Sequence, residues 1–266
     1  MKHLSTYHLH TTFSDGKCSP EEMLRSAVDC KCAEIGFTDH APMDIDCCWS
    51  MKKERVSEYI STLEALREQN KDKIKVYIGI EQDYFSPDPD WKPDFIIGSV
   101  HYVLKDGHYL EVDNSAETMK HNVDTYYGGD VYAYCEDYYE LVGDIYNKTK
   151  CDIIGHFDLV TKFNEKMPMI DEAHPRYVRA VNKALDALVK TPVTFEVNTG
   201  AMSRGYRTAP YPSEEIIFRL KELDKKIVFT SDTHASNTVM WNINELARIF
   251  DDKGIKYIDS LDEILK

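Results

Sequence analysis

Short apolar runs with strand-forming character alternate with helical patterns along nearly the whole chain. Seven runs are predicted as strands, at residues 4–10, 34–40, 74–81, 94–101, 151–158, 193–198 and 226–234. Helices are predicted between them, at residues 19–28, 52–69, 131–147, 175–189, 213–223 and 237–250. A helix between successive strands lets those strands run parallel, so the alternation predicts an α/β fold with a mostly parallel sheet.

The number of strand and helix units favours a barrel over an open sheet. Seven or eight such units in 266 residues match the size of a single (β/α) barrel, and residues 1–266 are predicted to form one domain. An open, doubly wound sheet is the alternative, but no GxGxxG motif follows the first strand. Residues 255–260 are predicted as a last strand, and the irregular residues 106–129 as loops and short helices.

Most of the predicted strands end on side chains that can bind a metal ion. The first strand ends in His8 and His10, whose side chains share one face because successive residues of a strand alternate between faces. The other runs end on His40, Glu81, His101, His156, Asn198, Asp232 and His234. Active sites of barrels form at the C-terminal ends of the strands, so these residues are expected to converge.

Six of the ten histidines occupy these strand ends. Together with the carboxylates of Asp15, Glu81 and Asp232 they supply nine ligands. A structural zinc ion takes four ligands, so nine suit a cluster of two or three metal ions. For each residue taken alone, the alternative is a structural role such as a hydrogen-bonded histidine or a helix N-cap at Asp232. The set as a whole predicts a multinuclear metal site.

The charge and the cysteines count against several classes of protein. Lys and Arg number 32 against 46 Asp and Glu, a net charge of −14, which disfavours binding to nucleic acid or to an anionic membrane. No run approaches the roughly 18 apolar residues of a membrane span, and no signal sequence is recognisable, so a soluble, cytoplasmic protein is expected. Seven cysteines at irregular spacings suit reduced thiols better than a disulfide framework.

Six motifs resemble, in order, those of the polymerase and histidinol phosphatase (PHP) family. They are HLHTTFSDG, FTDH, GIEQD, GSVH, IGHFD and SDTH, and they run from His8 to His234. The stand-alone length is similar to that of the histidinol-phosphate phosphatases of the family. The resemblance implies a distorted TIM-like (β/α)7 barrel with three divalent metal ions at the strand ends. Zinc is the favoured metal, with iron and manganese as alternatives.

The resemblance also implies a set of ligands for each metal ion. By motif, the first metal takes His8, His10 and Asp232, the second takes His101 and His156 with Glu81 bridging the two, and the third takes Asp15, His40 and His234. Every one of these positions carries an acceptable ligand. Asp232, Glu81 and His234 are the residues expected to act in catalysis, through the metal ions that they bind.

The chemistry implied by such a cluster is hydrolysis of a phosphate ester. Three divalent ions and three carboxylates leave a site with a charge of about +3, which attracts a phosphate monoester. A water that bridges two metal ions has its pKa lowered towards about 7, so hydroxide is available to attack phosphorus. The leaving group needs a proton or a cation, for which a metal-linked histidine or acid, Asp158 and Asp39 are the alternatives.

Residues near the cavity rim are expected to choose the substrate. The segment VNTGAMSRGYR follows the sixth strand and carries Asn198, Arg204 and Arg207; an arginine can fork onto phosphate oxygens. Asp158 is the fourth predicted substrate-binding residue. An alcohol that carries an amine and an imidazole also needs a carboxylate and polar or aromatic partners. The residues open for that role are Asp83, Tyr84, Asp158 and Glu111.

The function implied by the resemblance is hydrolysis of L-histidinol phosphate to L-histidinol and phosphate, in histidine biosynthesis. One alternative is another phosphoesterase of the family, acting on nucleotides or phosphodiesters. Another is a non-catalytic, metal-binding regulatory module. The acidic composition counts against a long nucleic-acid substrate, so a small-molecule phosphate monoester is the expected partner. The sequence leaves the oligomeric state and the identity of the metal open.

Overall fold

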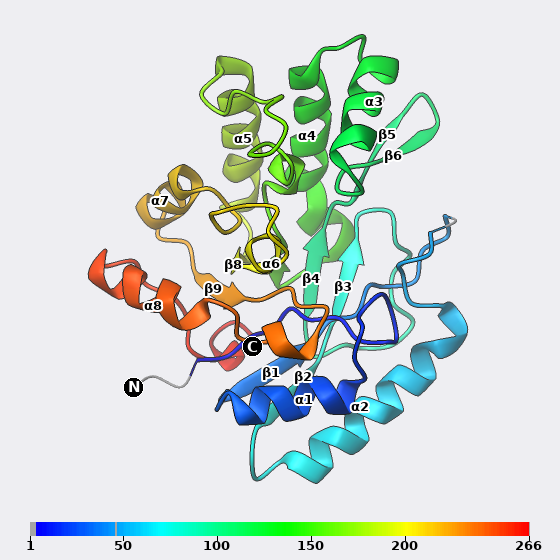
Figure 1. Cartoon of the computed structure of the whole chain (residues 1–266), viewed down its shortest axis with the longest axis vertical. Coiled ribbons are helices and arrows are strands. Elements are labelled where there is room, and N and C mark those ends of the chain that lie inside the picture. The colour runs from blue at the N-terminus through cyan, green and yellow to red at the C-terminus, as the bar shows by residue number, and fades with distance from the viewer. Residues whose placement is uncertain (1–3, 46, 266) are drawn as a thin grey trace.

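The computed structural model describes residues 4–45 and 47–265, and its strands and helices alternate along the chain (Figure 1). The strands are β1 (Glu34–Phe37), β2 (Lys75–Ile78), β3 (Ile80–Asp83), β4 (Ile96–Ser99), β5 (Tyr102–Lys105), β6 (His108–Glu111), β7 (Ile153–Ile154), β8 (Thr194–Asn198) and β9 (Ile227–Thr230). The helices are α1 (Pro20–Asp29), α2 (Val56–Asn70), α3 (Ala116–Tyr126), α4 (Val131–Thr149), α5 (Pro175–Leu188), α6 (Gly200–Ser203), α7 (Glu214–Glu222) and α8 (Ile243–Asp252). Short 3₁₀ turns lie at Lys53–Arg55, Leu159–Thr161, Ser236–Thr238 and Leu261–Glu263.

The strands form a distorted TIM-like barrel. Five of them run parallel in the order β3, β4, β7, β8 and β9, and β1 pairs in parallel with β2. β2 and β3 follow one another with only Gly79 between them. Isolated parallel bridges connect the remaining neighbouring segments of the barrel, between Thr6 and Ile35, Leu9 and Thr233, and His40 and Glu81. The predicted (β/α)7 fold is confirmed, with single bridges at three places in the described chain where a regular barrel has a ladder.

Residues 4–10, the first predicted strand, lie in the barrel without forming a regular strand. The neighbouring chain turns at Asp232, whose φ of 42° lies in the left-handed region. Just before this turn, the backbone N–H of Ser231 donates to the hydroxyl of Thr6 at 3.1 Å. The backbone N–H of His10 donates to the carbonyl of Thr233 at 2.9 Å. The seam between the first and last strands therefore depends on a side chain as well as on backbone pairing.

Two other segments differ from the prediction. β5 and β6 form an antiparallel hairpin across Asp106 and Gly107, whose φ values of 49° and 81° suit a two-residue turn. α3 follows this hairpin, so the region at 106–129 is more regular than predicted. The predicted strand at residues 255–260 is wrong. That segment is irregular and packs Ile258 against the barrel end opposite the strands' C-termini, beside β2 and β4.

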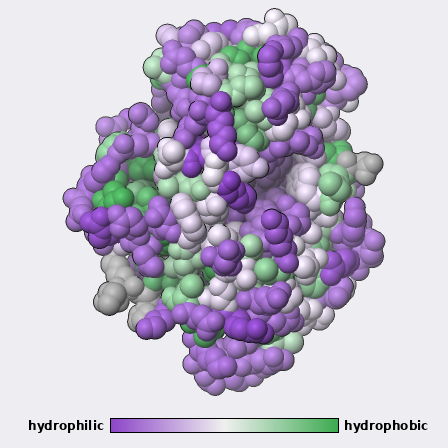
Figure 2. Space-filling view, in the orientation of Figure 1, coloured by the Kyte–Doolittle hydropathy of each residue, from purple (hydrophilic) through white to green (hydrophobic). Residues whose placement is uncertain are grey.

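Helices cover the barrel on several sides. α3, α4 and α5 lie together on one side of the strands, and α1 and α2 lie on the opposite side (Figure 1). α4 buries Tyr134, Tyr138 and Tyr139 completely, so its tyrosine-rich sequence packs the core. The face shown in Figure 2 is predominantly hydrophilic. Within the described ranges, no helix combines the length and the apolar character needed to cross a bilayer.

Candidate metal centre

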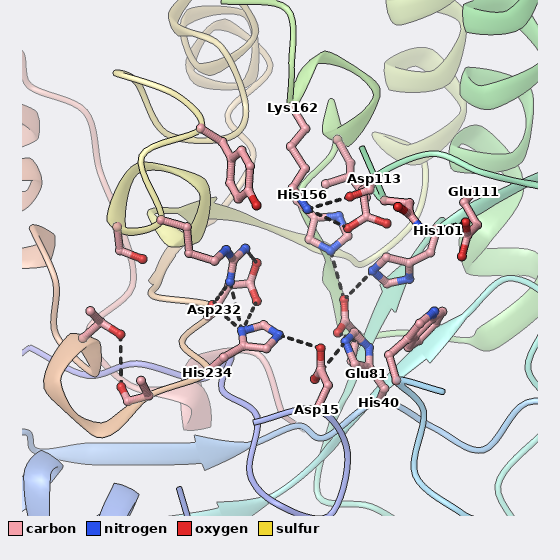
Figure 3. Close-up of a pocket in the computed structure, with 18 of the residues that line it drawn as sticks. Asp15, His40, Glu81, His101, Glu111, Asp113, His156, Lys162, Asp232 and His234 are labelled. Carbon is pink, nitrogen blue, oxygen red and sulfur yellow. Dashed lines mark hydrogen bonds and ion pairs between the residues drawn. The ribbon is translucent and has the colours of Figure 1, made fainter. Parts of the chain in front are cut away.

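The C-terminal ends of the barrel strands bring all nine predicted ligands together at one cavity, seven in its lining and two just beneath. The cavity has a volume of about 530 Å³, and its floor is shown in Figure 3. His8 and His10 lie beneath this floor and are fully buried. The other seven line the cavity: Asp15, His40, Glu81, His101, His156, Asp232 and His234.

Glu81, which follows the first residue of β3, contacts imidazoles from four other segments. Its Oε2 atom lies 2.8 Å from Nδ1 of His40 and 3.1 Å from Nε2 of His8. Its Oε1 atom lies 3.0 Å from Nε2 of His156 and 3.6 Å from Nε2 of His101. A carboxylate that faces different rings with its two oxygens has the geometry needed to bridge two metal ions.

Three groups of side chains each offer ligand atoms that lie within 4.8 Å of one another. They are His8, His10 and Asp232; His10, Asp15, His40 and His234; and His40, Glu81 and His101. The first group contains the residues assigned by motif to the first metal. The second adds His10 to those assigned to the third metal. The remaining group contains His40, whereas the motif assignment gives His156 to the second metal. The assignment of individual ligands to individual metal ions therefore stays a prediction.

A tight loop carries Asp15 to histidines of two other segments. Its Oδ2 atom lies 3.2 Å from Nε2 of His234, and its Oδ1 atom lies 3.7 Å from Nε2 of His40. The loop is fixed by Asp39, whose carboxylate accepts hydrogen bonds from backbone N–H and hydroxyl groups at residues 11–14. Asp39 is fully buried and does not line the cavity, so its position gives no support to a role as proton donor.

Several buried polar atoms of the cluster have no hydrogen-bond partner within the protein. They are Nε2 of His8, both ring nitrogens of His10, Nδ1 of His156 and Oε2 of Glu81. Buried polar atoms are costly to leave unsatisfied. Imidazole nitrogen and carboxylate oxygen are donors that zinc, iron and manganese accept. The donor set therefore fits divalent metal ions, and the cluster supports metal binding.

The charges of the cluster are strongly coupled. Burial disfavours a charge on His8, but neighbouring carboxylates, Glu81 first among them, raise the pKa of His8 well above the usual imidazole value. Burial and the adjacent ring of His234 lower the pKa of His10 to about 3. Burial also opposes ionisation of Glu81, yet the surrounding imidazoles hold its pKa well below the usual carboxyl range. His10 is therefore a neutral ring at pH 7, which is the form that binds a metal.

Two buried carboxylates hold histidine rings of the cluster from outside. Oε2 of Glu196 lies 2.9 Å from Nδ1 of His8, and Oδ2 of Asp83 lies 3.1 Å from Nδ1 of His101. Glu196 is not among the predicted site residues, because it lies inside the apolar run of β8. A signal was present, since an acid two residues before Asn198 shares its face of the strand and needs a buried partner.

The walls of the cavity carry residues that no sequence pattern marked. The Trp49 ring packs edge-on against His40, with centroids 4.5 Å apart, and stacks on Tyr102 at 6.0 Å. Nζ of Lys162 lies 3.0 Å from Oδ2 of Asp113 (Figure 3). The cavity therefore has an aromatic pair and an ion pair on its walls as well as the cluster on its floor.

Of the four predicted substrate-binding residues, Arg204 lines the cavity. The other three side chains are buried and bonded within the protein. The Asn198 amide donates to Glu196 at 2.7 Å. Nη1 of Arg207 lies 3.5 Å from Oδ2 of Asp158. The structure therefore does not bring Asn198, Arg207 or Asp158 to the cavity.

The residues left open for the alcohol part of a substrate are also separated by the fold. Glu111 lines the cavity, and Asp83 is bonded to His101. The hydroxyl of Tyr84 donates to Asp144 at 2.8 Å. Among these open residues with described side chains, Glu111 is thus the one whose carboxylate reaches the cavity wall.

Known proteins share both the sequence and the fold. A Deinococcus radiodurans protein named "Probable histidinol-phosphatase" is 28% identical over 267 residues, which covers 96% of this chain and 95% of that protein. The histidinol-phosphatase of Bacillus subtilis is 24% identical over 262 residues, covering 87% of this chain and 94% of that protein. The crystal structure of histidinol phosphate phosphatase from Lactococcus lactis, complexed with zinc, L-histidinol and phosphate, superimposes with a TM-score of 0.73. It is 21% identical, and the superposition covers 96% of this chain and 95% of that one.

The motif order noted in the sequence has a counterpart in a family profile. The profile of the PHP domain matches residues 6–200, which is most of the chain. The matched range contains seven of the nine predicted ligands, and Asp232 and His234 follow it on the chain that leaves β9. The chain belongs to the PHP domain family.

Proposed function

We propose that this protein is a phosphatase that hydrolyses L-histidinol phosphate to L-histidinol and inorganic phosphate. The observation that carries the proposal is the convergence of six histidines and three carboxylates on one cavity. The relatives named as histidinol-phosphatases align over most of this chain. The Lactococcus lactis structure contains zinc, L-histidinol and phosphate. These likenesses support the same substrate here.

The cluster is proposed to hold three divalent ions, with zinc favoured and iron or manganese as alternatives. The proposed ligands are His8, His10, Asp15, His40, Glu81, His101, His156, Asp232 and His234. Bound there, such ions would supply positive charge and would make a bound water more acidic, the chemistry that phosphate-ester hydrolysis needs. The protein's own part is to fix the rings and carboxylates in a buried, rigid floor.

Arg204 adds a positive charge of the protein at the edge of the cluster. Its Nη1 atom lies 2.9 Å from the Asp232 carbonyl and 2.9 Å from Nδ1 of His234. Its Nη2 atom lies 3.2 Å from Oδ2 of Asp232. A guanidinium held by these contacts keeps other N–H groups for phosphoryl oxygens, and its planar shape suits two oxygens at once. Arg204 is therefore proposed to bind the phosphoryl group.

The walls of the cavity are proposed to bind the alcohol part of the substrate. Glu111 and Asp113 provide carboxylates that suit an ammonium group, although Asp113 is already paired with Lys162. Trp49 and Tyr102 provide aromatic surface that suits an imidazole ring. This combination favours a small amino alcohol over a bare phosphate or a nucleic-acid end.

The protein is further proposed to work as a single cytoplasmic domain. The proposed ligands come from both ends of the chain, at His8 and His234, so neither half contains the whole site. The seven cysteines are free, which suits a reducing compartment. Both statements are open to direct tests by limited proteolysis and by cell fractionation.

The test of the function is phosphate release by the purified protein, with metal analysis of the same sample. L-histidinol phosphate should be hydrolysed faster than an aryl phosphate or a dinucleotide, and chelation should abolish turnover. His10→Ala should lower kcat/KM by roughly 100-fold or more. His121→Ala is the matched control, because that histidine is exposed on α3 and does not line the cavity.

Other results would redirect the proposal. If metals are bound and a nucleotide or a dinucleotide is the better substrate, the hydrolase stands and the histidinol assignment falls. If metals are bound and His10→Ala leaves phosphate release unchanged, the cluster has no part in hydrolysis. A regulatory, metal-binding role would then be the better account.

A further inference from the structure

The carboxylate of Glu196 accepts four hydrogen bonds beneath the proposed metal centre. Glu196 lies in the middle of β8, and it is 1% exposed. Its Oε2 atom lies 2.9 Å from Nδ1 of His8 and 2.8 Å from the Thr230 hydroxyl, which donates to it. Its Oε1 atom accepts from the backbone N–H of His156 at 2.6 Å and from the Asn198 amide at 2.7 Å. All the accepting capacity of this carboxylate is in use.

These contacts determine which nitrogen of His8 carries a proton. An ionised carboxylate can only accept, so Nδ1 of His8 must donate to Glu196. In the neutral ring Nε2 is then left with a lone pair. This atom lies 3.1 Å from Glu81 Oε2 and 3.8 Å from Asp232 Oδ1, and no hydrogen bond satisfies it. A lone pair that faces two carboxylate oxygens is repelled unless a cation lies among them. Without a metal ion that cation is a second proton on the ring, in keeping with the raised pKa of His8, and a bound metal ion would take its place.

The same carboxylate also fixes a second part of the centre. Its bond to the backbone N–H of His156 holds the chain just after β7. That chain places the His156 ring 3.0 Å from Glu81 Oε1, whereas His8 faces Oε2 of the same carboxylate. Glu196 therefore contacts one residue at each oxygen of the proposed bridging carboxylate.

We propose that Glu196 is a positioning residue for the metal centre, which orients the His8 ring with Nε2 towards the ions and holds the His156 backbone in register with it. Glu196 touches no substrate and binds no metal itself. Asp83 has a simpler version of this role, since its Oδ2 atom contacts both the backbone N–H and Nδ1 of His101, at 2.8 and 3.1 Å. The inference rests on the proposed function, because it concerns the affinity of that metal centre.

Glu196→Gln tests the role with little change of shape. The amide keeps one acceptor oxygen but replaces the other with an NH₂ group, which then meets two donors. Glu34→Gln is the matched control. Glu34 is also buried and accepts bonds from Tyr7, Ser260 and Leu261 at the other end of the barrel.

The measurement is zinc affinity of the full-length protein by competition with a chromogenic chelator. The absorption spectrum of the cobalt-loaded protein is the second readout, because it reports ligand geometry. Glu196→Gln should weaken zinc binding by roughly 10–100-fold and shift the cobalt bands. Glu34→Gln should lower the urea midpoint of the metal-free protein and leave zinc affinity within twofold of wild type.

Glu196→Asp guards against a variant that does not fold. It keeps the charge and the acceptors but shortens the side chain by one methylene, so it cannot reach both His8 and His156. Its zinc affinity should fall between those of wild type and Glu196→Gln. Wild-type affinity and an unchanged cobalt spectrum in either Glu196 variant would overturn the positioning role. Failure of the wild-type protein to bind zinc, cobalt or manganese would instead overturn the proposed function.

Discussion

Asp39→Ala would remove the carboxylate that fixes the loop carrying Asp15. Four groups donate to this carboxylate: the backbone N–H groups of Thr11 and Ser14, at 2.8 and 3.0 Å, and their hydroxyl groups, at 2.9 and 2.6 Å. Asp39 and Thr11 are completely buried, whereas Ser14 is partly exposed. Loss of the acceptor therefore leaves unsatisfied donors in the interior.

The size of the effect follows from these donors. The Thr11 N–H loses its partner in a dry environment, at a cost of about 1–3 kcal/mol. The Ser14 N–H is nearer to solvent and costs less, and the two hydroxyls can rotate towards other acceptors. We expect a total loss of about 3 kcal/mol in the free energy of unfolding, which corresponds to a drop of roughly 6–12 °C in the thermal midpoint.

The assay is urea unfolding of the metal-free protein, followed by circular dichroism, so that changes in metal binding do not enter the result. Asp39→Asn is the matched control. Its amide oxygen can still accept from the two backbone groups, and its NH₂ can donate to a hydroxyl oxygen. It should therefore cost about 1 kcal/mol. In a separate metal analysis, Asp39→Ala should also reduce metal content, because Asp15 is no longer held near His40 and His234.

Two outcomes would refute the reasoning. If the free energy of unfolding of Asp39→Ala lies within about 1 kcal/mol of the wild-type value, water satisfies the unpaired donors without cost. Equal destabilisation by alanine and asparagine would mean that the negative charge of Asp39, and not its acceptor geometry, fixes the loop.

Three further outcomes are expected. Exhaustive chelation should lower the thermal midpoint, because ions that bind the native cluster and not the unfolded chain stabilise the fold by mass action; equal midpoints before and after reloading with zinc would contradict this. Gly16→Ala should lower metal content and reduce phosphate release by roughly 10–100-fold, because a Cβ at Gly16 would lie 2.3 Å from the carbonyl oxygen of His10. A Gly16→Ala protein with wild-type metal content and wild-type activity would show that the loop adapts to the added methyl group. Arg176→Met should lower the urea midpoint at neutral pH, because hydrogen bonds from Arg176 hold the pKa values of Asp130 and Glu136 below their usual range. A carboxyl group with a lowered pKa stabilises the fold above its unfolded pKa, and this stabilisation is lost as the pH falls through the folded pKa. The difference in urea midpoint between Arg176→Met and wild type should therefore shrink in acid. A difference in urea midpoint that does not depend on pH would indicate lost packing instead.

The proposed ligands were predictable because most of them directly follow an apolar run that can be recognised as a strand. His101 and His156 each come just after an apolar run, where a strand stops at the open end of the barrel. Local sequence locates such a residue, and the topology brings it to the others without any knowledge of side-chain contacts. The expected convergence followed from the position of these residues at, or in the loop just after, the C-terminal ends of predicted strands.

The partners of the ligands could not be predicted in the same way. The contact between His8 and Glu196 joins residues 4–10 to β8, and it depends on side-chain direction within the barrel. Trp49 reaches the cavity from an irregular segment, whose path no periodic pattern describes. The same holds for Arg207, which turns inwards to Asp158 although its sequence position resembles that of Arg204.

Two differences in the fold have different causes. The hairpin at Asp106 and Gly107 has a signal in the sequence, since Asp-Gly between two short β-rich runs is a strong turn signal. The flanking residues 106–129 as a whole show no regular period, which is why they are predicted as irregular. The loss of regular pairing at residues 4–10 was not visible. On one side of this segment the neighbouring chain has left-handed backbone at Asp232, whose carboxylate lies 3.2 Å from His10. Such a backbone position interrupts a regular ladder, and it is not encoded in a local pattern.

The seam between the first and last strands has a consequence for biosynthesis. His8 and His10 leave the ribosome well before the chain that pairs with them, Asp232 to His234. An ion that needs ligands from both cannot be held fully by a nascent or truncated chain, however well its first half has folded. Binding at the proposed first and third metal sites would thus require a chain that extends past His234, whereas Glu81, His101 and His156 are all in place earlier. Zinc supplied late in folding would, by the same geometry, find the full set of ligands only in chains that contain both segments.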